Sequence, residues 1–247
     1  MINLSISTFN IFENIDVLNN YLLIIQNKKE LYKFLKDIGN GCIYDELIQV
    51  YDENNRKLKN SDYIDFVPSI LSIDINNKRN INALIRIIKK SQEEPLKNSI
   101  NVLNKYLKDL FNNIRLEIPF TIIDNIELEE DDIIKLMNIK IEDNDQNLLE
   151  RINTYIQTSF ELRNIKIFVF YGLFSLLEDQ EVDSLIKNCK YYGIIIVDIE
   201  NIDIQTSIDF NKLILDQDIC LLKLTTYFSI IRPQNLRFGS SAIFNYF

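Results

Sequence analysis

The segment around which the chain is organised is Lys78–Lys108, with the sequence KRNINALIRIIKKSQEEPLKNSINVLNKYLK. It carries eight basic residues and two acidic ones, although the whole chain has a formal net charge of −9. Residues 124–150 show the reverse balance, with ten carboxylates and two lysines. We expect an acidic chain that concentrates its basic residues in one segment to use that segment for binding.

The basic segment has the apolar periodicity of two helices. In the first, Ile81, Leu84, Ile85 and Ile88 recur at the i, i+3, i+4, i+7 spacing that lines one face of a helix. Pro95 marks the start of the second, because proline is tolerated in a first helical turn. The apolar residues that follow have the alternating spacing of a coiled-coil seam. They are Leu96, Ile100, Leu103, Leu107, Leu110 and Ile114.

Each of these predicted helices also carries a basic ridge. The ridge consists of Arg79, Arg86, Lys89 and Lys90 on the first helix and of Lys97, Lys108 and Arg115 on the second. A solvated face explains a single ridge, whereas two adjacent helices with the same bias also suit contact with nucleic acid. Both interpretations stay open at this point. A third helix, Gln146–Leu162, has a similar apolar stripe and is predicted to pack antiparallel on the coiled-coil seam.

Carboxylates gather around the start of another predicted helix, Ile133–Met137. Six of them lie between Asp124 and Asp132, and Glu142 and Asp143 follow. The helix dipole favours carboxylates at a helix N-terminus, and capping accounts for two or three of them. The others would suit a calcium or magnesium ion, although the segment does not match an EF-hand loop. Since the chain contains no histidine, a zinc or non-haem iron site is disfavoured.

Apolar runs on both sides of the helical region predict the strands of an α/β domain. Ile165–Tyr171 and Ile194–Val197 flank an amphipathic helix, Leu177–Lys190, and lack alternation, which is typical of parallel strands covered on both faces. We therefore expect an α/β fold with a mostly parallel sheet and an inserted helical leg. The predicted parts are a head of residues 1–77 and 163–222, a leg of residues 78–162, and a C-terminal extension of residues 223–247.

One strand-to-helix step, from Tyr21–Ile25 into Lys28–Ile38, is where a nucleotide-binding protein would place its phosphate loop. The junction Gln26–Glu30 contains no glycine. Glycines allow the backbone amides of such a loop to curl around a phosphate. The sequence therefore disfavours a nucleotide kinase or ATPase, although it leaves the fold position in place.

Cysteine usage and hydrophobicity indicate the cellular setting. The three cysteines are widely spaced and lack a C-x-x-C pair, which argues against a disulfide framework and for a reducing environment. The N-terminus has no signal-peptide pattern, and the longest apolar run, Ile167–Leu177, is too short to cross a bilayer. We expect a soluble cytoplasmic protein with no membrane partner.

The order of segments over Met1 to about Leu222 resembles the ring-forming adaptation proteins of type II-A CRISPR systems, the accessory subunits needed to acquire new spacers. The segments that carry this resemblance are Leu47–Asp52, Ile70–Asn76, Leu128–Asp132 leading into Ile139–Glu142, Ile165–Tyr171 and Leu215–Cys220. None of them is a catalytic signature. Their order and spacing make the resemblance specific, and the chain beyond Leu222 departs from the family's usual end.

The resemblance implies a head related to P-loop ATPases but without working nucleotide motifs, and a non-enzymatic role. It implies a homotetrameric ring that admits double-stranded DNA, with a preference for free ends, and that Ca²⁺ stabilises. It also implies that the integrase and the guide-directed nuclease of the same locus are partners. By position, the expected calcium ligands are Glu127, Glu129, Asp131, Asp132 and Glu142. The expected DNA contacts are Arg79, Arg86, Lys89, Lys90, Lys97 and Lys108.

Two other functions stay open on the sequence. One is a divergent P-loop-like nucleotide kinase or ATPase. The other is a structural helical-interaction protein whose basic and acidic segments pair between subunits, which would have no affinity for DNA even with calcium.

Overall fold

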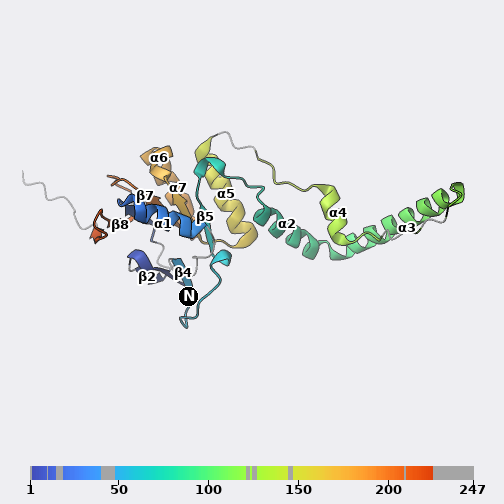
Figure 1. The fold of residues 1–247 in the computed structure, drawn as a ribbon, viewed down its shortest axis with the longest axis horizontal. Coiled ribbons are helices and arrows are strands. Elements are labelled where there is room, and N and C mark those ends of the chain that lie inside the picture. Colours follow the sequence, from blue (N-terminus) through green and yellow to red (C-terminus); the bar gives the residue numbers. More distant parts are fainter. Residues whose placement is uncertain are drawn as a thin grey trace, which may run out of the picture.

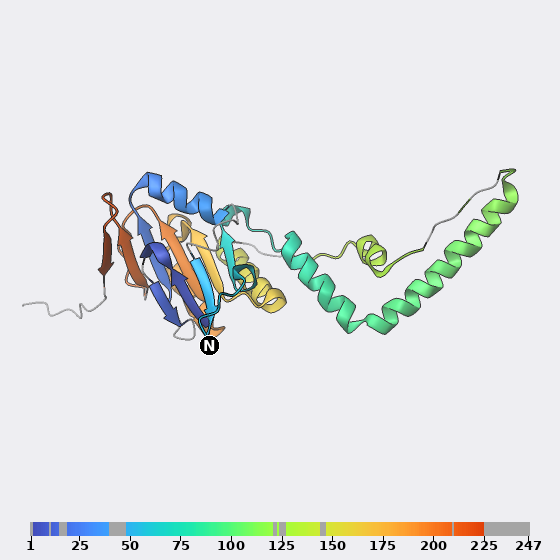
Figure 2. The same cartoon turned by 60° about the horizontal axis from the view of Figure 1, so that its bottom comes forward.

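The computed structural model describes residues 2–9, 11–14, 19–39, 48–120, 123, 127–143, 147–208 and 210–224. These residues form a head built on a β-sheet and a long helical arm that projects from it (Figures 1 and 2). The main sheet has six strands in the order β5-β6-β7-β3-β8-β9. They are β5 (Ile64–Val67), β6 (Ile167–Tyr171), β7 (Ile195–Glu200), β3 (Tyr21–Ile25), β8 (Asn211–Leu215) and β9 (Leu221–Leu224).

All neighbouring strands of this sheet are parallel except β8 and β9. All five residues of β3 are buried, as expected for a central parallel strand with both faces covered. The predicted α/β fold with a mostly parallel sheet is confirmed. Residues 225–247, most of the predicted C-terminal extension, lie outside the described residues.

Side chains of β3 alternate between two hydrophobic cores, one on each face of the sheet. Leu22 and Ile24 pack with α5 (Leu148–Arg163) and α7 (Asp179–Tyr191), and the short α6 (Leu173–Leu176) belongs to the same core. Leu23 and Ile25 pack with α1 (Lys28–Gly39) and with a small second sheet. This second sheet is antiparallel, in the order β2 (Ile11–Asn14), β1 (Ile2–Ile6) and β4 (Ile48–Asp52).

The arm consists of α2 (Lys78–Ser91), α3 (Glu93–Glu117) and α4 (Glu130–Met137). The side chain of Asn77 caps α2 by accepting hydrogen bonds from the backbone N–H groups of Arg79 and Asn80. Both views show α2 and α3 running away from the head (Figures 1 and 2).

The predicted antiparallel pairing of the third helix with the α3 seam is wrong. This helix, α5, packs on the main sheet, where Ile152, Tyr155 and Ile156 join the core around Phe168. The broad apolar face of β6 lets α5 bury more hydrophobic surface than the narrow seam of α3 would. The division of the chain at residues 77, 162 and 222 stays a prediction, but α5 contributes to the core of the head.

Two asparagine side chains join the two limbs of the arm. The outgoing limb is residues 76–117, with α2 and α3, and the returning limb is residues 127–143, with α4. Asn76 donates to the carbonyl oxygen of Ile141 (2.9 Å) and accepts from its N–H (2.7 Å). Asn104, on α3, makes the same pair of bonds with Leu128 (3.1 and 2.8 Å). Each side-chain amide therefore bonds both the C=O and the N–H group of one backbone residue, as the backbone of a neighbouring β-strand does. These bonds hold α4 beside α3.

We expect Asn104→Asp to loosen the returning limb. The variant loses the donated N–H and places a carboxylate against the carbonyl oxygen of Leu128, which costs about 1–3 kcal/mol locally. Hydrogen exchange over residues 127–137 should be about tenfold faster or more. Asn101→Asp, at an exposed position on the same helix, is the control, and equal exchange in both variants would contradict the role of Asn104.

Candidate nucleic-acid interface

The basic residues of α2 divide into free and paired side chains. Arg86 and Lys90 are exposed, and neither has an ion pair among the described residues. Lys89 differs, because its Nζ contacts Oδ1 of Asp131 in α4. This hydrogen bond raises the pKa of Lys89 above its usual value and lowers the pKa of Asp131. Lys89 therefore holds the two limbs of the arm together.

The basic face of α3 is divided in the same way. Lys97 is paired with Glu93 one turn earlier (2.6 Å), which raises the pKa of the lysine. Lys108 is exposed and has no ion pair within the part of the chain that the structure describes. Asn104, which binds Leu128, lies between these two lysines on nearly the same side of the helix. The returning limb is therefore bonded to the basic side of α3, between Lys97 and Lys108.

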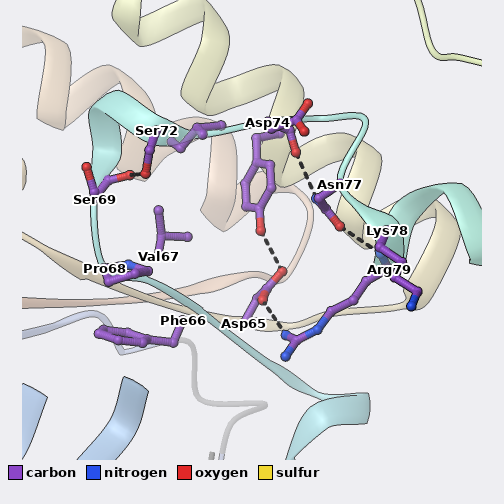
Figure 3. Close-up of a pocket in the computed structure, with 12 residues that line it drawn as sticks. Asp65, Phe66, Val67, Pro68, Ser69, Ser72, Asp74, Asn77, Lys78 and Arg79 are labelled. Atoms are coloured by element: carbon purple, nitrogen blue, oxygen red, sulfur yellow. Dashed lines mark hydrogen bonds and ion pairs between the residues drawn. The ribbon is translucent and has the colours of Figure 1, made fainter. Parts of the chain in front are cut away.

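Arg79 lies at the base of the arm and is bound to Asp65 of β5 (Figure 3). Its Nη1 is 3.3 Å from Oδ1 of Asp65. The Asp65 carboxylate, only 3% exposed, also accepts from the hydroxyl of Tyr155 (2.8 Å) and contacts Nη2 of Arg163. Burial and the neighbouring Asp65 carboxylate raise the pKa of Tyr155. One buried carboxylate thus joins β5, α2 and α5.

The cluster of Asp65, Arg79, Tyr155 and Arg163 was not predicted from the sequence. An aspartate inside the apolar strand Ile64–Val67 is the signal that could have found it, since a buried carboxylate needs partners. Its partners are separated from it by up to 98 residues, and no local spacing indicates them.

Three of the five predicted calcium ligands have other partners in a single copy of the chain. Glu129 and Asp132 form the capping box of α4, in which Oδ2 of Asp132 accepts from the N–H of Glu129 (3.0 Å). Asp131 is paired with Lys89. Glu127 and Glu142 are exposed.

Across the described residues, no three Asp, Glu, Cys or His side chains gather in a way that could hold a metal ion. Calcium takes six to eight oxygen ligands. The described carboxylates of one copy therefore do not form a complete calcium site, and the capping interpretation accounts for Glu129 and Asp132.

The apolar seam of α3 is largely uncovered. Leu103, Leu110 and Ile114 are 40%, 56% and 41% exposed. Further apolar side chains are exposed elsewhere on the arm, namely Val102, Leu116, Phe120, Ile123, Leu136 and Met137; together with the exposed part of the seam they are called the apolar patch below. Exposed apolar patches of this kind mark interaction surfaces.

The junction between β3 and α1 has no room for a phosphate loop. The strand ends at Ile25 and the helix begins at Lys28, so two residues connect them. Oδ1 of Asn27 accepts from the N–H groups of Lys29 (3.0 Å) and Glu30 (3.3 Å). The amides that would cradle a phosphate are thus already bonded to a side chain.

A buried pair of acids lies toward the carboxyl end of β7. Asp198 accepts from the N–H of Leu173 (3.2 Å) and Glu200 from the N–H of Phe174 (3.1 Å), which braces the turn after β6. Burial, followed by repulsion from Glu200, raises the pKa of Asp198 well above its usual value. Burial also raises the pKa of Glu200.

Because the folded-state pKa of Asp198 is raised, the folded chain holds this proton to a higher pH than the unfolded chain. Stability from this group is therefore complete below the usual aspartate pKa of about 4 and is lost as the pH rises through the folded-state value. We expect the urea midpoint of the wild type to fall as the pH rises above about 4, and that of Asp198→Asn to fall less. The exposed Glu161→Gln should behave as the wild type does. Equal slopes for all three proteins would contradict the titration of Asp198.

The fold is that of an α/β protein with a projecting helical arm, and this arm carries basic and apolar side chains. A family model described as "CRISPR-associated protein (Cas_Csn2)" matches residues 43–219. The chain belongs to this family, which confirms the resemblance to the type II-A CRISPR proteins and establishes a CRISPR-associated role.

The structure is similar to the crystal structure of Stu0660 of Streptococcus thermophilus, with a TM-score of 0.54 and 13% sequence identity. The match covers 90% of this chain and 76% of that one. At this identity the likeness shows a shared fold. A comparison with curated protein sequences gives no match. Among the described helices, none combines the length and the apolar character that spanning a bilayer requires.

Proposed function

We propose that this protein is a non-enzymatic, calcium-dependent ring of four copies that binds ends of double-stranded DNA without sequence specificity. In this role it supports the acquisition of new CRISPR spacers in antiviral defence, together with the integrase and the guide-directed nuclease of the same locus. The proposal builds on the family of the chain.

The observation that carries the proposal is the set of basic side chains left free on the arm of an acidic protein. Arg86, Lys90 and Lys108 are exposed and have no ion pair in the described ranges, whereas Lys89 and Lys97 are paired with carboxylates. Free cations on a rigid helix suit the regularly spaced phosphates of a duplex. Binding through phosphates is insensitive to base sequence and weakens steeply with salt.

The apolar patch on the arm supports the assembly of several copies. Leu110, Phe120 and Leu136 are 56%, 75% and 75% exposed, and a second copy of the arm would remove them from water. In a ring, the arms of neighbouring copies would also bring their basic residues around one opening.

Calcium in this proposal would bind between copies rather than within one. Glu127 and Glu142 are the best candidate ligands, because they neither cap α4 nor pair with Lys89. A bound Ca²⁺ would neutralise the repulsion between acidic chains. Because the described carboxylates of one copy do not gather into a complete site, a neighbouring copy would supply further ligands.

A phosphate-transfer enzyme is disfavoured by the two-residue connection between β3 and α1 and by the bonds of Asn27 to the first amides of the helix. A helical-interaction protein remains the second candidate. The contacts Lys89–Asp131 and Lys97–Glu93 lie within one copy and show that basic and acidic groups of the arm can pair, and this candidate requires the same pairing between copies.

A gel shift that compares linear with closed circular duplex tests the proposal. We expect the protein to retain linear DNA in the presence of calcium, to retain closed circles weakly, and to release both when a chelator is added. No shift in either condition would overturn the DNA-binding ring and leave the helical-interaction protein.

For calcium, we expect Glu127→Ala/Glu142→Ala to remove the calcium-dependent change in particle size, measured by light scattering. Glu129→Ala/Asp132→Ala is less informative alone, because it also removes the capping box of α4, which costs about 1 kcal/mol. Circular dichroism of both double variants separates lost helix from lost calcium. A size change that persists in Glu127→Ala/Glu142→Ala would place the ligands elsewhere.

A further inference from the structure

A cavity of about 380 Å³ lies where the arm leaves the head. The chain between Asp65 and Arg79 surrounds it: the backbone leaves β5, makes a short 3₁₀ helix (Ile70–Ser72), and enters α2 at Lys78 (Figure 3). The ion pair between Asp65 and Arg79 joins the two ends of this segment. The cavity is thus bounded by both the head and the first turn of the arm.

The walls of the cavity differ in chemistry. One side is apolar and is made by Val67, Pro68 and Ile73, whereas the ring of Phe66 packs on the other face of the sheet. The other side carries the cations Lys78 and Arg79, and the hydroxyl groups of Ser69, Ser72 and Tyr155 also line the space. A ligand with an anionic group at one end and a flat, largely apolar body at the other matches this arrangement.

The cations at this site exceed the carboxylates. Asp65 is shared by two guanidinium groups, those of Arg79 and Arg163. Lys78 has no ion pair within the described part of the chain, and the Arg79 side chain is 62% exposed. The other carboxylate of the lining, Asp74, accepts from the N–H of Asn76 (2.8 Å). Three cations against two carboxylates leave one positive charge in excess.

We propose that this cavity binds a nucleoside 5′-monophosphate unit. The phosphate contacts Lys78 and the exposed N–H groups of Arg79, since a guanidinium group matches phosphate oxygens with two parallel hydrogen bonds. The base lies against Pro68 and Ile73, where one of its faces is removed from water. The cavity volume is at the lower end of the range for small-molecule sites and would be mostly empty with phosphate alone.

Two sources can supply this chemistry: a free nucleotide, or the phosphorylated terminal nucleotide of a DNA strand. The second source rests on the proposed DNA binding, and the first does not. In either case an occupant contacts the chain that follows β5 and the first turn of α2 at once.

Isothermal titration of the whole chain with deoxyadenosine 5′-monophosphate tests the site. We expect binding that is about tenfold weaker in Lys78→Ala, because one charge-assisted hydrogen bond is lost. Deoxyadenosine and inorganic phosphate, titrated separately, should each bind more weakly than the nucleotide. Lys78 is exposed, so thermal melts should show that the variant folds as the wild type does.

Lys90→Ala is the matched control, because Lys90 lies on the same helix but does not line the cavity. It should leave nucleotide affinity unchanged while lowering duplex affinity. No binding of the nucleotide, equal binding of nucleotide and deoxyadenosine, or no effect of Lys78→Ala would overturn the site. None of these results bears on duplex binding by Arg86 and Lys90.

Duplexes with 5′-phosphate and 5′-hydroxyl ends distinguish the two sources. A preference for phosphorylated ends that Lys78→Ala abolishes assigns the site to DNA ends. Equal affinity for both ends, together with nucleotide binding that Lys78→Ala weakens, assigns it to free nucleotides.

Discussion

Replacing Asp65 with alanine should lower the free energy of unfolding by about 3–5 kcal/mol, as expected when one partner of a buried ion pair is removed. The carboxylate holds two guanidinium groups and the hydroxyl of Tyr155. Without it, Arg163, whose side chain is 9% exposed, remains in the head as an uncompensated buried charge. Urea unfolding followed by circular dichroism measures the loss.

Arg79→Ala is the control for this prediction. It leaves Asp65 paired with Arg163 and removes a side chain that is 62% exposed, so it should cost about 1 kcal/mol or less. If Asp65→Ala lowers the free energy of unfolding by less than about 1 kcal/mol, the ion pairs of Asp65 contribute little to stability. Other contacts would then anchor the arm to the head.

Reversing two free charges on the arm, in Arg86→Glu/Lys90→Glu, should lower the affinity for linear duplex by about 100-fold at 0.1 M salt. Each lost phosphate contact also reduces the slope of log affinity against log salt by about 0.9, so the slope should decrease by about 2. Lys89 is left unchanged in this variant, because its reversal would oppose Asp131 and disturb α4.

The control Lys29→Glu/Lys36→Glu makes the same change in net charge on α1 of the head, at two exposed positions. It should lower duplex affinity much less. Size-exclusion chromatography should show both variants in the assembly of the wild type. Equal loss of affinity in both double variants would mean that net charge, and not the arm, governs DNA binding.

The strands of the head were predictable where they are buried on both faces. Ile165–Tyr171 and Ile194–Val197 are continuous apolar runs, and they correspond to β6 and β7. β8 was not predicted, because Asn211–Leu215 begins with two polar residues, which are not buried, and so lacks a continuous apolar run. β2 was missed too: its residues Ile11–Asn14 form a strand by pairing with β1.

The candidate interface was predictable only as a set of charges. Helical spacing placed Arg86 and Lys90 together on α2, and they are free in the structure. The same reasoning could not distinguish them from Lys89, whose partner Asp131 lies 42 residues further along the chain. Nor could it show that Arg79 is bound at the base of the arm. Capping by two or three of the carboxylates was predicted, and the structure identifies Glu129 and Asp132 as the pair.

The sequence alone determined the secondary structure wherever a pattern is local: apolar runs for the parallel strands, helical spacing for α2 and α3, and the segregation of charge along the arm. Only the tertiary structure decided which of these charges are free, where α5 packs, and which side chains surround the cavity at the base of the arm. The physical reason is the range of the interactions. Periodicity acts within a few residues, whereas a buried carboxylate such as Asp65 takes its partners from whichever elements the fold brings beside it.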